Sequence, residues 1–137
     1  MVFLQFDDID TAGHQAGFDP GSGAYRRAIE QTDAHVGEVL SAVRCRPRFP
    51  EEDWLIIVTT DHGGSGFLHG QDLPEHRTVF LIVHGPRAVP GMIEPAPAIV
   101  DVPATALAHL GVAAKETWEW DGRPVGLKAA YDAADQD

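Results

Sequence analysis

The chain has 137 residues, 44% hydrophobic and 23% charged, which is an ordinary composition for one globular domain. It carries 10 Lys and Arg residues against 21 Asp and Glu residues, so its net charge is −11 at pH 7. This balance argues against duplex nucleic acid or an anionic membrane as a partner, but not against a phosphate ester, because bound metal ions can reverse the local charge.

Neither a membrane span nor a leader peptide is indicated. The chain contains no run of about 18 or more apolar residues. The segment before Asp7 is too short for the apolar region of a signal peptide and carries no basic residue. The localisation stays unknown, because the chain opens in a strand-like run, as a fragment would. Cys45 is single, so no internal disulfide is expected.

The first part of the chain predicts a strand, a long loop and a helix. Residues 2–6 are short, apolar and aromatic-rich, which is typical of a buried strand. Residues 7–24 are rich in Asp and Gly and predict a functional loop. From Gly23 to about Arg44 apolar residues recur at three- and four-residue steps, which predicts a helix.

Two further strands and a short helix are expected in the second part. Residues 54–60 form a nearly continuous apolar run, which predicts a strand buried on both faces, as in a parallel sheet. Residues 79–83 predict another buried strand. Asp101 is predicted to cap a short helix. Residues 118–120 alternate like an edge strand.

This alternation of strands and helices predicts the α/β class. Residues 1–127 are expected to belong to one domain, and residues 128–137 read as a polar tail that frays.

An aspartate and a histidine follow each of two predicted strands. Asp10 and His14 follow the first, and Asp61 and His62 follow the second. Ligands bind at the carboxyl ends of strands in open α/β sheets. Carboxylate oxygens and neutral imidazoles are what a divalent metal needs. The spacing of four between Asp10 and His14 fits one face of a helix or a loop that folds inward.

His69, which is followed by Gly70, is the third histidine candidate, and His76 competes with it. The other histidines are weaker candidates because they lie in predicted helices or at a strand end: His35, His109 and His84. The plain alternative is that all these groups are capping or solvated residues.

In their order and spacing, several motifs resemble the alkaline phosphatase superfamily. The motifs are Asp10-Thr11-Ala12-Gly13-His14, Thr60-Asp61-His62-Gly63-Gly64, Gly66-x-x-His69-Gly70 and Asp121-Gly122-Arg123. The most similar branch is the type I phosphodiesterase/nucleotide pyrophosphatase group, with sulfatases as relatives. The resemblance runs from about Val2 to Gly126. It implies a three-layer sandwich with a central, mostly parallel sheet flanked by helices, of which this chain would be the C-terminal part.

The resemblance also implies two divalent metal ions, commonly zinc. Asp10, His14 and His69 would hold one ion, and Asp61 and His62 would hold the other. The family's Thr or Ser nucleophile, and an aspartate that completes the second site, come from an upstream segment. No catalytic residue is therefore identified in this chain. Among its serines and threonines, Ser65 lies closest to the expected site. We expect about one tightly bound ion.

The function that the resemblance implies is metal-dependent hydrolysis of phosphoric esters, with the isolated chain weakly active or inactive. The alternatives are a catalytically incompetent metal-binding fragment or partner-completed module, and, within the superfamily, a sulfatase, a phosphomonoesterase or a phosphosugar mutase. A phosphate ester is the expected substrate. A strand edge left uncovered would favour self-association or pairing with a missing N-terminal half.

Overall fold

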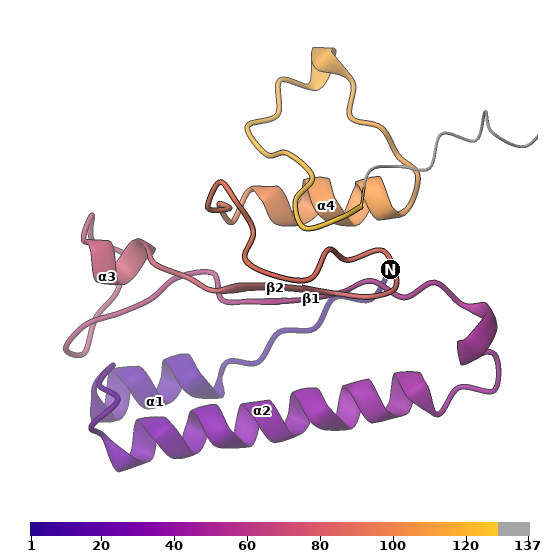
Figure 1. The fold of residues 1–137 in the computed structure, drawn as a ribbon. Coiled ribbons are helices and arrows are strands. Elements are labelled where there is room, and N and C mark those ends of the chain that lie inside the picture. The colour runs from indigo at the N-terminus through magenta and orange to yellow at the C-terminus, as the bar shows by residue number, and fades with distance from the viewer. Residues whose placement is uncertain (129–137) are drawn as a thin grey trace, which may run out of the picture. The chain divides into compact units, whose positions relative to one another are not determined.

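A computed structural model describes residues 1–128 of the chain (Figure 1). Apart from Lys128, the predicted polar tail lies outside the described residues. The chain forms two compact units. The first comprises Met1–Glu52 and His62–Val79, and the second comprises Asp53–Asp61 and residues 80–128.

The first unit is built on two helices that lie side by side (Figure 1). Helix α1 covers Asp8–Ala16, and helix α2 covers Gly23–Arg44. The predicted helix over residues 23–44 is therefore confirmed. Its first turn is capped by Ser22, whose Oγ accepts the N–H of Tyr25 at 3.5 Å. A short 3-10 helix, Phe49–Glu51, and helix α3, Pro74–Arg77, complete the regular structure of this unit among the described residues.

The predicted strand at residues 2–6 is wrong. These residues have no regular structure, and the Phe3 side chain is 82% exposed. A strand needs a neighbour for its N–H and C=O groups, and the described part of the first unit contains no strand to pair with. The predicted loop at 7–24 is instead half helical. Acidic residues in the first turn of α1, Asp8 and Asp10, suit the positive end of the helix dipole.

The second unit contains the two strands predicted from the apolar runs. Strand β1 covers Ile56–Thr59, strand β2 covers Leu81–His84, and they pair antiparallel with Ile56 opposite His84. Sheet and helices in one chain confirm the α/β class. The expectation for residues 54–60, burial on both faces as in a parallel sheet, is wrong, because the pair is antiparallel and no residue of β1 is buried. The expected burial of residues 79–83 is also wrong, since Ile82 of β2 is 52% exposed.

Helix α4, Asp101–His109, contributes Ala104 to the small core of the second unit, in which Val125 is also buried. Thr105 of α4 is fully buried and links this helix to the segment that contains Val125. Its Oγ1 donates to the Asp101 carbonyl at 2.7 Å and accepts the N–H of Val125 at 2.9 Å. Both hydrogen-bonding directions of this hydroxyl are thus satisfied.

Asp101 does not cap α4 as predicted, because Val100 occupies the N-cap position. The buried Asp101 carboxylate instead accepts the N–H groups of Ala98 at 2.9 Å and Arg123 at 2.8 Å. A Cβ at Gly122 would overlap the carbonyl of Val100, so glycine lets this turn approach the helix. Asp101 therefore ties the Asp-Gly-Arg turn to α4.

The predicted edge strand at residues 118–120 is also wrong. The chain forms a 3-10 helix at Glu116–Trp118 instead, and the rings of Trp118 and Trp120 lie 4.9 Å apart. Glu119, between the two tryptophans, has a φ of 51°, in the left-handed region, so the backbone here is not extended as a strand requires.

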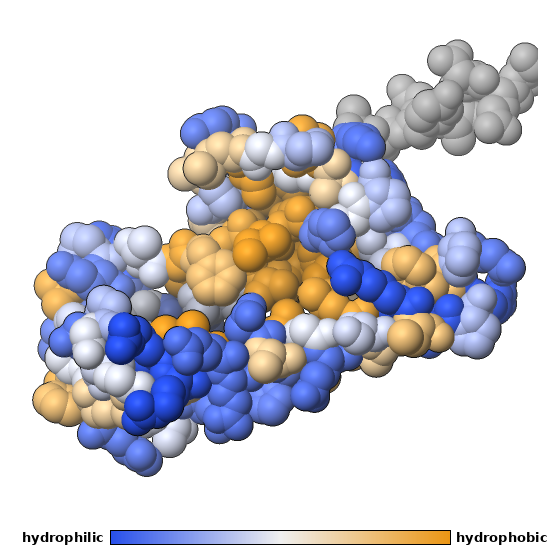
Figure 2. All heavy atoms as spheres, turned by 60° about the horizontal axis from the view of Figure 1, so that its bottom comes forward, coloured by the Kyte–Doolittle hydropathy of each residue, from blue (hydrophilic) through white to orange (hydrophobic). Residues whose placement is uncertain are grey.

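Apolar side chains also remain on the surface of the chain (Figure 2). Among the large exposed ones are Val2, Phe3, Phe67, Phe80, Ile82 and Met92. Exposed apolar surface favours association. Within residues 1–128, no helix has both the length and the apolar character needed to cross a bilayer.

Asp101 generates a pH prediction. Burial raises its pKa, but the N–H groups of Arg123 and Ala98 and the Arg123 charge outweigh that effect and hold the pKa below its ordinary value. The stabilisation is therefore present above the unfolded pKa of about 3.9 and is lost as the pH falls through the folded pKa.

We predict that Asp101→Asn lowers the free energy of unfolding by about 1.5–3 kcal/mol at neutral pH, because charged hydrogen bonds are lost. Urea unfolding should show the difference shrinking below about pH 4. Asp121→Asn, at an exposed acid of the same turn, is the control. An equal effect of the two substitutions on the free energy of unfolding would contradict the stabilising role given to the Asp101 carboxylate.

Candidate metal centre

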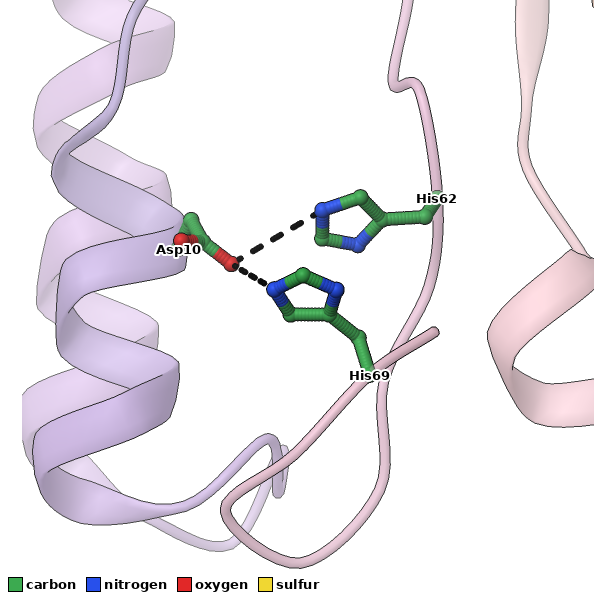
Figure 3. A group of neighbouring side chains, drawn as sticks. All are labelled: Asp10, His62 and His69. Carbon is green, nitrogen blue, oxygen red and sulfur yellow. Dashed lines mark ion pairs between the residues drawn. The ribbon is translucent and has the colours of Figure 1, made fainter. Parts of the chain in front are cut away.

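Helix α1 and the segment His62–Val79 bring three of the predicted ligands together. Figure 3 shows the Asp10 carboxylate pointing toward the rings of His62 and His69. Asp10 Oδ1 lies 3.5 Å from His69 Nε2 and 3.9 Å from His62 Nε2. One ligand atom from each of the three residues lies within 4.8 Å of the others. A single cation could contact all three.

His14 belongs to the same cluster. Because it lies one helical turn after Asp10, both side chains extend from the same face of α1. His14 Nε2 is 3.5 Å from Asp10 Oδ2 and 3.1 Å from His69 Nε2. We call Asp10, His14, His62 and His69 the Asp–His cluster.

Backbone carbonyls orient two imidazoles of the Asp–His cluster. His14 Nδ1 donates to the carbonyl of Phe67 at 2.9 Å, and His62 Nδ1 donates to the carbonyl of Gly63 at 2.9 Å. A carbonyl only accepts, so Nδ1 carries the proton in each ring, and a neutral ring then has its lone pair on Nε2. Both Nε2 atoms are the ones directed at Asp10. Metal-binding histidines are usually held in this way.

The Asp–His cluster fits a divalent cation. The Asp10 side chain is partly exposed, yet its Oδ1 atom is buried and has no hydrogen-bond partner. Leaving a charged oxygen without a partner is costly. Nitrogens 3.1 Å apart, as in His14 and His69, also need a proton or a cation between them. A metal ion would satisfy both requirements.

Phe18 forms an apolar wall beside the Asp–His cluster. Its ring meets His14 and His69 edge-on, with centroids 5.4 and 6.0 Å away. A Cβ at Gly13 or at Gly64 would overlap the Phe18 ring. The glycines of both sequence motifs are therefore required for the same reason, which is the close approach of one aromatic ring.

Tyr25 of helix α2 packs edge-on against Phe18 with the ring centroids 5.7 Å apart. Burial, and then the negative charge of Asp10, raises the pKa of the Tyr25 phenol above its ordinary value. The phenol therefore stays protonated at neutral pH and keeps its capacity to donate a hydrogen bond.

Two other candidates named from the sequence are Asp61 and His76. Asp61 precedes His62 in the chain and ends a segment of the second unit, so its assignment as a ligand stays a prediction. His76, the competitor of His69, is buried and hydrogen-bonded to Ser65 and Gln71. The structure thus brings His69, not His76, to Asp10.

Neither Phe18 nor Tyr25 was singled out as part of this site by the sequence motifs. The glycines in both motifs were the only indirect indication of these residues. A glycine can mark a place where another group packs closely against the backbone, but the sequence does not identify that group. Contact between Phe18 and Gly64 joins residues far apart along the chain.

Comparison with known proteins assigns the family. The family described as type I phosphodiesterase / nucleotide pyrophosphatase matches residues 1–80, more than half of the chain. Among curated proteins, the phosphopentomutase of Methylobacterium sp. (strain 4-46) is 34% identical over 121 residues, which cover 88% of this chain and 27% of that protein.

Two further phosphopentomutases are similar to the chain. Those of Edwardsiella ictaluri (strain 93-146) and Pectobacterium carotovorum subsp. carotovorum (strain PC1) are 30% and 32% identical over 114 and 113 residues. Each alignment covers 82% of this chain and 25% of the relative. The chain therefore spans about a quarter of the length of the curated relatives it matches. No solved structure matches significantly.

The α/β fold and these matches place the protein in the alkaline phosphatase superfamily, as the motifs predicted. Within that superfamily, the chain belongs to the type I phosphodiesterase/nucleotide pyrophosphatase family.

The hydrogen-bond pattern predicts the proton positions of three histidines. We expect His14 and His62 to carry the proton on Nδ1, and His76, whose Nδ1 accepts the N–H of Gln71, to carry it on Nε2. Two-bond proton–nitrogen NMR spectra of the metal-free chain report which ring nitrogen carries the proton. A proton on Nε2 of His14 or His62 would contradict the role given to the carbonyls.

The Phe18 wall predicts opposite effects of one substitution at two helical glycines. A Cβ at Gly37 of α2 meets nothing within 4 Å, so Gly37→Ala should stabilise the fold by about 0.5–1 kcal/mol. Gly13→Ala gains the same helix propensity but pushes into Phe18, and should destabilise by about 1–3 kcal/mol. Urea unfolding measures both. Equal stabilisation would show that the ring yields freely.

Proposed function

We propose that this chain supplies the divalent-metal site of an enzyme that cleaves or transfers phosphoric esters. The observation that carries the proposal is the buried Asp10 Oδ1, which has no hydrogen-bond partner and faces the Nε2 atoms of His62 and His69. Membership of the type I phosphodiesterase/nucleotide pyrophosphatase family supports the class of chemistry.

Asp10, His62 and His69 would hold the ion, with His14 as a further ligand beside them. When bound, a divalent ion polarises a phosphoryl oxygen and lowers the pKa of a bound hydroxyl. The chain's own groups orient the ligands: the Phe67 and Gly63 carbonyls fix two rings, and the Phe18 ring keeps one side apolar. A set rich in imidazole suits Zn²⁺ better than Mg²⁺ or Ca²⁺.

The two-ion arrangement that the resemblance implies remains a proposal. It assigns Asp10, His14 and His69 to one ion, and Asp61 and His62 to the other. His62 Nε2, however, lies 3.9 Å from Asp10 Oδ1. For the chain by itself we therefore propose a single tightly bound ion.

Hydrolysis of phosphodiesters is the first candidate reaction, because the family match supports it. Transfer of a phosphoryl group on a pentose phosphate is the second, because the similar curated proteins are phosphopentomutases. Both reactions need a nucleophile, which we propose lies outside residues 1–137. Pairing with another copy or with an N-terminal half stays a prediction that the exposed apolar side chains support.

We predict that the purified chain binds about one Zn²⁺ ion in a chelator-competition titration. Asp10→Asn and His69→Ala should each weaken binding by more than about 100-fold, because even the partners that orient metal ligands contribute about 10–100-fold. His84→Ala, at an exposed histidine of β2, is the matched control and should leave the affinity unchanged.

Binding that survives Asp10→Asn, or no Zn²⁺ binding by the wild-type chain, would overturn the proposed site. The reaction class is tested separately with a nitrophenyl phosphodiester and a pentose phosphate. Weak or absent turnover of both is expected from the chain alone. Brisk turnover of either would show that the chain contains its own nucleophile.

A further inference from the structure

His76 connects both ends of the loop that carries His69. The His76 side chain is 4% exposed and projects from helix α3. Its Nδ1 accepts the N–H of Gln71 at 3.0 Å, and its Nε2 lies 2.8 Å from Ser65 Oγ. Since Ser65 precedes His69 and Gln71 follows it, one imidazole ties together the two ends of the segment 65–71.

The interior of that segment sets the geometry of two members of the Asp–His cluster. The Phe67 carbonyl accepts the His14 Nδ1 proton at 2.9 Å, and His69 Nε2 lies 3.5 Å from Asp10. Reciprocal backbone hydrogen bonds of 3.1 and 3.2 Å between Ser65 and Leu68 close the turn. A shift of this loop would therefore move a candidate ligand and the group that orients another.

The backbone of His76 also holds the residue after His62. The His76 carbonyl accepts the N–H of Gly63 at 2.9 Å. A Cβ at Gly63 would overlap the carbonyl of Glu75, so the chain after His62 runs directly against α3. His76 thus contacts the residue after His62 and both ends of the loop that carries His69.

The Ser65–His76 contact is not arranged as a nucleophile and its base. The amide of Gln71 can only donate, so Nδ1 of His76 is unprotonated, and Nε2 donates its proton to Ser65 Oγ. A base would need the lone pair on Nε2 to take the hydroxyl proton. Both nitrogens of a buried ring are instead satisfied, which rigidifies the loop.

We propose that His76 is a positioning residue for the metal site: it fastens the 65–71 loop so that His69 and the Phe67 carbonyl are held in place. The proposal rests on the proposed function, in that it assumes the Asp–His cluster binds the ion. Groups that orient ligands from outside the coordination sphere affect metal affinity by about 10–100-fold.

The test compares Zn²⁺ affinity and the visible spectrum of bound Co²⁺ in the full chain and its variants. We expect His76→Leu to weaken Zn²⁺ binding by about 10–100-fold and to alter the Co²⁺ spectrum, although every ligand is kept. Ser65→Ala removes one contact and leaves the ring packed, so about a tenfold loss is expected. His76→Gln, which can still donate to Ser65, should recover part of the affinity.

Thr78→Val is the matched control, since it removes the hydrogen bond from Thr78 Oγ1 to the Pro74 carbonyl on the same turn. It should change neither affinity nor spectrum. Circular dichroism establishes that each variant is folded. If His76→Leu does not fold, the Zn²⁺ affinity and Co²⁺ spectrum of Ser65→Ala test the proposal. Unchanged affinity and spectrum in Ser65→Ala would overturn the proposal while leaving the metal site intact.

A readout without metal separates this proposal from the proposed function. The Leu68 amide, which donates to the Ser65 carbonyl, should exchange with solvent faster in metal-free Ser65→Ala than in wild type and Thr78→Val. Faster exchange supports the anchoring of the loop even if the chain binds no Zn²⁺. Equal exchange rates would overturn it.

Discussion

The candidate centre depends on one electrostatic constraint, the placement of a carboxylate oxygen where water does not reach it. Asp10 Oδ1 is buried without a hydrogen-bond partner, and imidazole nitrogens of His62 and His69 face it. With its proton on Nδ1, His62 presents a lone pair at Nε2, which does not compensate a buried negative charge. A cation in the cluster would remove the penalty and could use imidazole lone pairs as ligands.

Close packing explains why two distant motifs carry glycine. Gly13 lies on α1 and Gly64 lies after His62, yet the same Phe18 ring occupies the space that a Cβ would need at either position. Small residues at both places let the helix and the 62–69 segment approach each other closely. The same ring then lies edge-on to two imidazoles, so the packing that brings the ligands together also shields them.

Around the Asp–His cluster, most orienting contacts come from the backbone. Carbonyls of Phe67 and Gly63 set two ring orientations, and His76 holds the loop from which one of these carbonyls comes. Backbone groups are fixed by the fold and vary little with side-chain substitution.

Local patterns of the sequence were enough to predict the helix at 23–44 and the strands within 54–60 and 79–83, and they named Asp10, His62 and His69, which the structure brings together. Helical periodicity depends on residues three and four positions apart, so the sequence alone determines it. The strands at 2–6 and 118–120 were mispredicted, because a strand also needs a partner that local sequence does not specify. Only the tertiary structure selected His69 over His76, since both follow the same motif. Packing directs one imidazole toward Asp10 and engages both nitrogens of the other with Ser65 and Gln71.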